Sequence, residues 1–184
     1  MSIRPILKIG DPFLYQISEP VSEFDTLELH SLIDDMRDTM KHVNGAGLAA
    51  PQIGISKRLV IFAMDNNPRY PDEIDIEETV LINPVINVVD NSYQGMWEGC
   101  LSVPEMRGYV ERPAHIRYQG YDQYGNQIDR TVTGFHAIVV QHECDHLDGV
   151  LYPQRIKDLT KFGFESELIN RSDYPVAVVE QEQN

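Results

Sequence analysis

The stretch VVQHECDHLDG, residues 139–149, holds two histidines four positions apart, with a glutamate directly after the first. Apolar residues lead into it and Asp148–Gly149, a typical helix end, closes it, so the stretch predicts a helix. Each helical residue turns the chain by about 100°, which places His142 and His146 about 40° apart on one face. Two imidazoles at this spacing can bind a common metal ion, although the pattern also occurs by chance.

The residues between the histidines fall on different sides of this predicted helix. Glu143 lies about 100° from His142, where it can contact a water beside an ion without binding the ion itself. Cys144 lies about 200° from His142, on the face of Val140 and Leu147. We therefore interpret Cys144 as a small buried apolar residue, and the site needs a ligand from another part of the chain.

The other cysteine, Cys100, stands in the segment MWEGCLSVPEMRG, residues 96–108. A thiolate and two imidazoles give three protein ligands and leave a fourth position for water, as in catalytic rather than structural zinc sites. His115 and His136 have no partner at ligand spacing, and we interpret both as non-ligands. Cys100 is therefore the candidate for the third ligand.

A third segment, NGAGLAAPQIG at residues 44–54, places glycine and alanine where another group must approach the backbone closely. It lacks the Lys-Ser/Thr ending of a phosphate-binding loop. On its own the segment is compatible with an ordinary loop after a helix, which leaves Gln52 without an evident role.

Apolar periodicity predicts a long helix over residues 25–45, begun by Asp25 and ended by Asn44–Gly45. A short C-terminal helix is predicted within residues 158–170. The apolar positions of the long helix recur every three or four residues, at Leu29, Leu32, Ile33, Met36, Met40 and Val43.

Short strands are predicted between the two longer helices, and the turn DQYGNQ (122–127) joins the last two as a hairpin. Residues 65–78 are predicted as a polar loop, and Pro84 indicates a sheet edge or a bulge. The sequence thus predicts an α+β fold in which antiparallel strands surround a central HExxH helix, with a long N-terminal helix. We expect one domain over residues 1–170 and a flexible acidic tail over 171–184. The predicted strands are 57–64, 79–90, 107–113, 115–122 and 127–133.

The chain of 184 residues carries a net charge of −14, from 15 basic and 29 acidic residues. This charge argues against general affinity for nucleic acid or anionic membranes. We find no apolar run of membrane-spanning length and no secretory or transit segment. The two cysteines are too few for a disulfide framework, so we expect a cytoplasmic protein. From the charge and the lack of a long apolar run, we expect no membrane contact and no sequence-specific binding of nucleic acid.

Three segments together resemble the motifs of the peptide deformylases, in the order in which that family carries them: GAGLAAPQ (45–52), EGCLSVP (98–104) and QHECDHLDG (141–149). Each motif is moderately specific, and the three in one short chain are highly specific. The resemblance implies a metal-dependent hydrolase that removes the formyl group from the N-terminal formylmethionine of newly made polypeptides and releases formate. Its partners would be these N-formylmethionyl nascent peptides and the ribosome.

The resemblance also implies a metal site with one divalent ion per chain. The family favours Fe(II), while the softness of the ligands also allows Zn, Ni or Co. The implied ligands are Cys100, His142 and His146.

Further roles follow from the same resemblance. Glu143 would act as general acid and base, and Gln52 and the backbone N–H of Leu101 would stabilise an oxyanion. The implied substrate-binding residues are Gly45, Gly47, Glu98, Gly99, Arg107, Phe135, Ile138 and Val139.

Two other functions remain open from the residues alone. A zinc endopeptidase of the HExxH type would need a third ligand downstream of the helix, where we find no recognisable motif. A non-catalytic module that binds a metal or a peptide N-terminus is the other possibility. It would keep the ligands, and a change of Glu143 would cause no loss of turnover.

Overall fold

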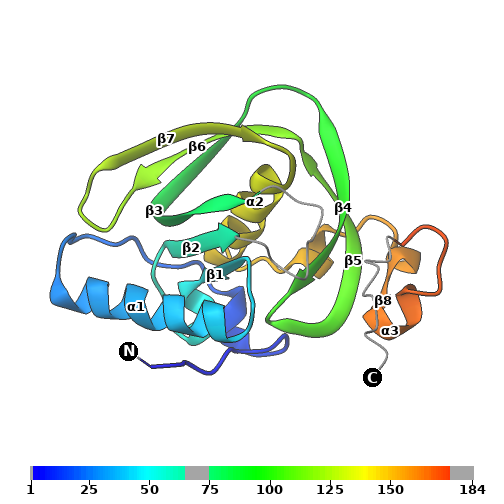
Figure 1. The fold of residues 1–184 in the computed structure, drawn as a ribbon, viewed down its shortest axis with the longest axis horizontal. Helices are drawn as coiled ribbons and strands as arrows, with labels where there is room; N and C mark the ends of the chain where they lie inside the picture. The colour runs from blue at the N-terminus through cyan, green and yellow to red at the C-terminus, as the bar shows by residue number, and fades with distance from the viewer. Residues whose placement is uncertain (1, 65–74, 175–184) are drawn as a thin grey trace, which may run out of the picture.

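The computed structural model describes residues 2–64 and 75–174, which form two antiparallel sheets and one enclosed helix, α2 (Figure 1). The five-stranded sheet has the order β1 (Gly47–Ala49), β2 (Leu59–Met64), β3 (Ile76–Val88), β6 (His115–Tyr121) and β7 (Gln127–Thr133). The three-stranded sheet has the order β4 (Tyr93–Cys100), β5 (Val103–Pro113) and β8 (Phe162–Phe164). The α-helices are α1 (Leu27–His42), α2 (Gly134–Leu147) and α3 (Glu165–Leu168), and the 3-10 helices are η1 (Pro12–Tyr15), η2 (Ala50–Ile53), η3 (Tyr152–Arg155) and η4 (Leu159–Lys161).

Strand β2 separates two hydrophobic layers, because successive side chains of a strand point to opposite faces of its sheet. Val60 and Phe62 belong to the cluster that contains the apolar residues of α2. Leu59 and Ile61 belong to the cluster that contains the apolar face of α1. This burial on both faces explains the continuous apolar run LVIFAM, and Figure 1 shows α1 and α2 on opposite sides of β1 and β2.

Helix α2 is enclosed on every side, since each residue from Ala137 to Leu147 is buried. The helix predicted from the HExxH stretch is therefore confirmed, together with its central place among antiparallel strands. A polar side chain on such a helix is costly unless it finds a partner inside the protein. The polar side chains of α2 therefore need hydrogen-bond or ion-pair partners from the elements packed around the helix.

The long N-terminal helix is present, but it begins and ends inside the predicted limits of 25–45. Thr26 is its N-cap, because its side chain accepts a hydrogen bond from the N–H of Leu29. The prediction that Asp25 begins the helix is wrong: its φ is 57°, and its carboxylate bonds His30 instead. At the other end Asn44, with φ 51°, supplies the predicted left-handed residue.

The predicted strands are all present, and the hairpin of β6 and β7 is confirmed. Residues 76–78 were predicted as loop but belong to β3, whereas 65–74 lie outside the described residues. The pairing of β3 with β6 shifts register around Pro84, so this proline marks a bulge and not a sheet edge. Strands β1 and β4 were missed, since glycine in each weakens the strand pattern.

The predicted C-terminal helix is wrong for most of its length. Gly163 pairs with Arg107 of β5, so the chain there forms η4, β8 and the single turn α3. Trp97 Nε1 donates to the carbonyl of Asp173 over 3.1 Å, and its ring contacts that of Tyr174. The predicted tail thus begins beside β4, residues 175–184 lie outside the described part, and the division into domain and tail stays a prediction.

Within the described residues, no helix is both long enough and apolar enough to cross a membrane.

Candidate active site

The side chains of Cys100, His142 and His146 converge at the end of β4 and on one face of α2. One ligand atom from each lies within 4.8 Å of the others, and Cys100 Sγ is 3.3 Å from His146 Nε2. Among the described residues, no other group of three or more histidine, cysteine or acidic side chains has this geometry. A thiolate and two imidazoles are the donor set of a transition-metal site with an open position, so the residues fit a metal ion.

Cys100 has the electrostatics of a ligand, whereas Cys144 does not. Burial opposes ionisation of Cys100, but the adjacent His146 and His142 hold the pKa of its thiol well below the usual range. Cys144 lies in the apolar cluster of the five-stranded sheet, and burial raises the pKa of its thiol. The structure thus separates the two cysteines as the helical geometry predicted.

Glu98 orients the ring of His142. Its Oε2 lies 2.8 Å from His142 Nδ1 and 2.9 Å from Arg112 Nη2. Burial alone would raise the pKa of Glu98, but hydrogen bonds from His142 and Arg112 lower it to about 2. An ionised carboxylate only accepts hydrogen bonds, so His142 Nδ1 is the donor. The other ring nitrogen, Nε2, is then available to bind a metal ion.

Arg112 and Asp145 were not predicted as site residues, yet they continue this buried chain of charges. Arg112 Nη1 bonds Asp145 Oδ2 over 2.8 Å, and Asp145 Oδ1 accepts from Arg155 Nη2 over 2.6 Å. Charges that are buried are tolerated when each has a partner of opposite sign. The available signal was Asp145 itself, an acidic residue on an otherwise buried helix.

Glu143 lies over the backbone of Gly47 and is buried. A Cβ at Gly47 would lie only 2.3 Å from Glu143 Oε1, so glycine is required for this approach. Glu143 Oε2 is buried without a hydrogen-bond partner among the described residues. Burial raises the pKa of Glu143 to about 7, which suits a group that takes and returns a proton near neutral pH.

Gln52 connects η2 to the turn after β4. Its Oε1 accepts from the N–H of Ala49, which fixes the orientation of the amide. Its Nε2 donates to Ser102 Oγ over 3.1 Å and lies 3.5 Å from Cys100 Sγ. The side chain is 1% exposed, so the polar residue that had no evident role in the sequence belongs to the site.

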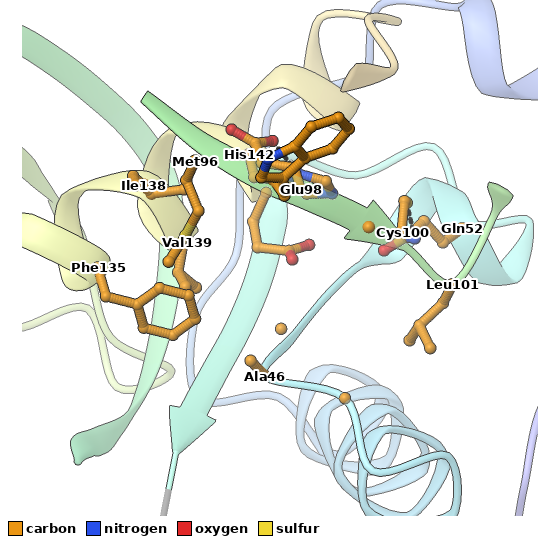
Figure 2. A pocket seen from close by; sticks show the side chains of 15 residues that line it. Ala46, Gln52, Met96, Glu98, Cys100, Leu101, Phe135, Ile138, Val139 and His142 are labelled. Atoms are coloured by element: carbon orange, nitrogen blue, oxygen red, sulfur yellow. Dashed lines mark hydrogen bonds and ion pairs between the residues drawn. The ribbon is translucent and has the colours of Figure 1, made fainter. Parts of the chain in front are cut away.

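A pocket opens between the ligand residues and the start of α2. Figure 2 shows Phe135, Ile138, Val139 and Met96 together on one side of it, with Cys100 and Gln52 on the other. Residues that the sequence did not indicate are Ala46, Met96 and Trp97. The lining includes these predicted substrate-binding residues: Gly45, Gly47, Glu98, Gly99, Phe135, Ile138 and Val139.

Arg107 is the predicted substrate-binding residue that does not line this pocket. It lines a neighbouring groove that shares Cys100 and Leu101 with the pocket. Its guanidinium lies against Gly99, where a Cβ would be 2.6 Å from Nη1, and its Nε bonds Glu165.

Comparison with known proteins gives a consistent result. A sequence model of the polypeptide deformylase family matches residues 3–162. Peptide deformylase 1 of Nitrosomonas europaea is 58% identical over 166 residues, which cover 90% of this chain and 94% of that protein. Peptide deformylase 1 of Bordetella pertussis is 56% identical over 171 residues, covering 93% and 97%.

Solved structures agree with these relatives. The Met-Ala-Ser-bound crystal structure of the class I type b peptide deformylase from Acinetobacter baumannii superposes with a TM-score of 0.82 at 42% identity. The match covers 85% of this chain and 100% of that one. The chain belongs to the polypeptide deformylase family, whose members are metal-dependent hydrolases that remove the N-formyl group from nascent peptides.

Proposed function

We propose that this site removes the formyl group from the N-terminal formylmethionine of newly made polypeptides and releases formate. The observation that carries the proposal is the convergence of two imidazoles and a thiolate beside Glu143, a buried carboxyl whose Oε2 has no hydrogen-bond partner among the described residues. Cys100, His142 and His146 would hold one divalent ion, with Fe(II) as the native metal and Zn, Ni or Co as substitutes. When bound, the ion acidifies a water molecule and polarises the formyl carbonyl.

Glu143 is proposed as the general base and acid. Its Oε2 takes a proton from the attacking water. Burial raises the pKa of this carboxyl, which makes it a stronger base for that proton. The same oxygen then returns the proton to the nitrogen of the departing amine. Gly47 supports this role, since the absence of a side chain lets Glu143 lie directly beside the substrate's path.

Gln52 and Leu101 are proposed to stabilise the oxyanion of the tetrahedral intermediate. Gln52 Nε2 lies next to Cys100, and its amide is oriented by the Ala49 N–H, so the donor is preorganised. The N–H of Leu101 belongs to the residue that directly follows the ligand in the chain. Loss of one such donor typically lowers kcat by about 10²–10³.

The apolar part of the pocket is proposed to bind the methionine side chain. Phe135, Ile138 and Val139 offer apolar surface, and Met96 adds a flexible thioether that adapts to an unbranched side chain. The Acinetobacter relative was crystallised with Met-Ala-Ser, a peptide that begins with methionine. The substrate backbone would pair with the segments Gly45–Gly47 and Gly99–Leu101, with Arg107 near its carbonyl groups.

The substrates would be nascent chains, so we expect the protein to work at the ribosome in the cytoplasm, without sequence-specific contact to nucleic acid. The net charge of −14 argues against general affinity for nucleic acid, so the nascent peptide itself is the proposed binding partner.

The test is formate release from formyl-Met-Ala-Ser by protein loaded anaerobically with Fe(II), and separately with Ni. Wild-type protein should release formate with either metal. Cys100→Ala should lose the metal and the activity, whereas the matched variant Cys144→Ala should keep both. Wild-type protein that releases no formate with either metal contradicts the function, and one bound metal per chain in Cys100→Ala contradicts the ligand set.

A further inference from the structure

The turn between β4 and β5 joins the proposed ligand to the proposed oxyanion donor. Cys100 ends β4 and Val103 begins β5, and these two residues pair across the ladder. Leu101 and Ser102 form the two-residue turn, so the peptide unit that links them projects from the end of the ladder. Its carbonyl and N–H therefore need partners from outside the strands.

Both ends of this peptide unit have such a partner. The N–H of Ser102 donates to Cys100 Sγ over 3.4 Å. The carbonyl of Leu101 accepts a hydrogen bond from Lys8 Nζ over 2.7 Å. The ammonium of Lys8 and the sulfur of Cys100 thus lie at opposite ends of one peptide dipole, and a cation at the carbonyl makes the N–H a stronger donor.

The backbone around Lys8 is tied to the same site, although the lysine itself is exposed. The N–H of Leu7 donates to the carbonyl of Gln52 over 2.8 Å, and the N–H of Ile9 donates to the carbonyl of Ser102 over 2.7 Å. Lys8 is therefore held between the segment that carries Gln52 and the turn that follows Cys100. The backbone bonds of Leu7 and Ile9 fix the position from which the Lys8 side chain reaches the carbonyl of Leu101.

We propose that Lys8 is a positioning residue of the metal site, which holds the Leu101–Ser102 peptide unit so that its N–H donates to the Cys100 sulfur. The inference rests on the proposed metal site. An N–H donor withdraws charge from a ligand sulfur and orients it, and groups that act on metal ligands in this way affect metal affinity as well as activity. Lys8 reaches the ligand from 92 positions earlier in the chain, outside all three family-like motifs.

The test uses Co(II), because absorption from cobalt–thiolate charge transfer reports on the sulfur without any turnover. Lys8→Met keeps an unbranched apolar stem and removes the ammonium, and Lys8→Arg restores a cationic donor. Lys157→Met is the matched control, since it removes an exposed lysine whose ammonium bonds Glu111 on β5. We expect Lys8→Met to bind Co(II) about tenfold more weakly in competition with a chelator, and to shift the charge-transfer band to lower energy.

Lys8→Arg and Lys157→Met should keep the wild-type affinity and band position. A Lys8→Met protein with the affinity and band of Lys157→Met overturns the role of Lys8 and leaves the metal site standing. If Lys8→Arg loses as much Co(II) affinity as Lys8→Met, the role of Lys8 is also overturned, because a cationic donor at this position would then have no effect. Wild-type protein that binds no Co(II) overturns the metal site and this inference with it.

Discussion

His142 Nδ1 donates a hydrogen bond to Glu98 Oε2 over 2.8 Å. Because Arg112 also bonds this carboxylate, Glu98 is ionised and cannot exchange roles with the imidazole. The contact therefore selects one tautomer of His142 and fixes the plane of its ring before any metal binds. The sequence predicts Glu98 as a substrate-binding residue, and it does line the pocket, but its carboxylate bonds His142.

Glu98→Gln should weaken metal binding. The amide keeps the shape of the side chain but places an NH₂ group against either His142 Nδ1 or Arg112, so one of these contacts becomes a clash of donors. We expect the affinity for Zn or Co to fall about 10–100-fold, measured by competition with a chelator. Glu111→Gln, at an exposed glutamate of β5 that pairs with Lys157, is the control and should bind like wild type. Equal affinities in the two variants would show that Glu98 does not orient the ligand.

Gly47→Ala should impair catalysis while the metal stays bound. The new Cβ would lie 2.3 Å from Glu143 Oε1, so the carboxyl must move away from its position beside the ligands. We expect kcat for the formyl peptide to fall about 10²-fold or more, with metal content unchanged. Gly163→Ala is the control, because its Cβ would meet only Leu168 at ordinary contact distance, 3.7 Å. A normal kcat in Gly47→Ala would contradict the role of Glu143.

The sequence was sufficient to bring the two candidate histidine ligands together, because their spacing depends on local geometry, whereas Cys100 lies 42 positions before His142 and became a candidate by elimination and by the family resemblance. A helical turn of about 100° per residue already places His142 and His146 together and turns Cys144 away. Gln52 was different, because its role depends on η2 meeting the turn after Cys100, a contact between segments 48 positions apart. No periodicity predicts such a contact, and only the resemblance to known motifs brought Gln52 into the site.

The same limit applies to the charges behind the site. Arg112 stands in an alternating strand, where an arginine normally points to solvent, and its burial at 4% exposure follows only from the packing of β5 against α2. The HExxH stretch contains its partner Asp145, but helical geometry alone does not show that this carboxylate is enclosed. Strands β1 and β4 were missed because pairing with neighbouring strands outweighs the low strand preference of their glycines.

Asp35 should make the docking of the N-terminal segment sensitive to acid. Its carboxylate accepts from the N–H of Ser2 and from Arg4 Nε. Burial opposes ionisation of Asp35, but these hydrogen bonds lower its pKa below the ordinary value. A carboxyl with a lowered folded-state pKa contributes stability above its unfolded pKa of about 3.9, and this contribution is lost as the pH falls through the folded value.

Asp35→Asn should therefore lower the urea midpoint of unfolding at pH 7, and the difference from wild type should shrink in acid. Asp129→Asn, which removes an exposed carboxylate paired with Arg117, should have a smaller effect at pH 7. A difference between wild type and Asp35→Asn that grows as the pH falls would have the wrong sign for this linkage.

Removal of the metal should make Cys100, and not Cys144, open to alkylation. Both side chains are nearly enclosed, at 6% and 7% exposure, so access alone does not distinguish them. Cys100 lines the pocket and its thiol has a lowered pKa, whereas the thiol of Cys144 has a raised pKa in an apolar cluster. Since the thiolate is the nucleophile, a chelator followed by iodoacetamide should label Cys100 at neutral pH, and bound Zn should protect it. Peptide mapping by mass spectrometry measures this, with Cys144→Ser as a control that should label at the wild-type rate. Labelling of Cys100 at the same rate with and without chelator would contradict its assignment as a metal ligand.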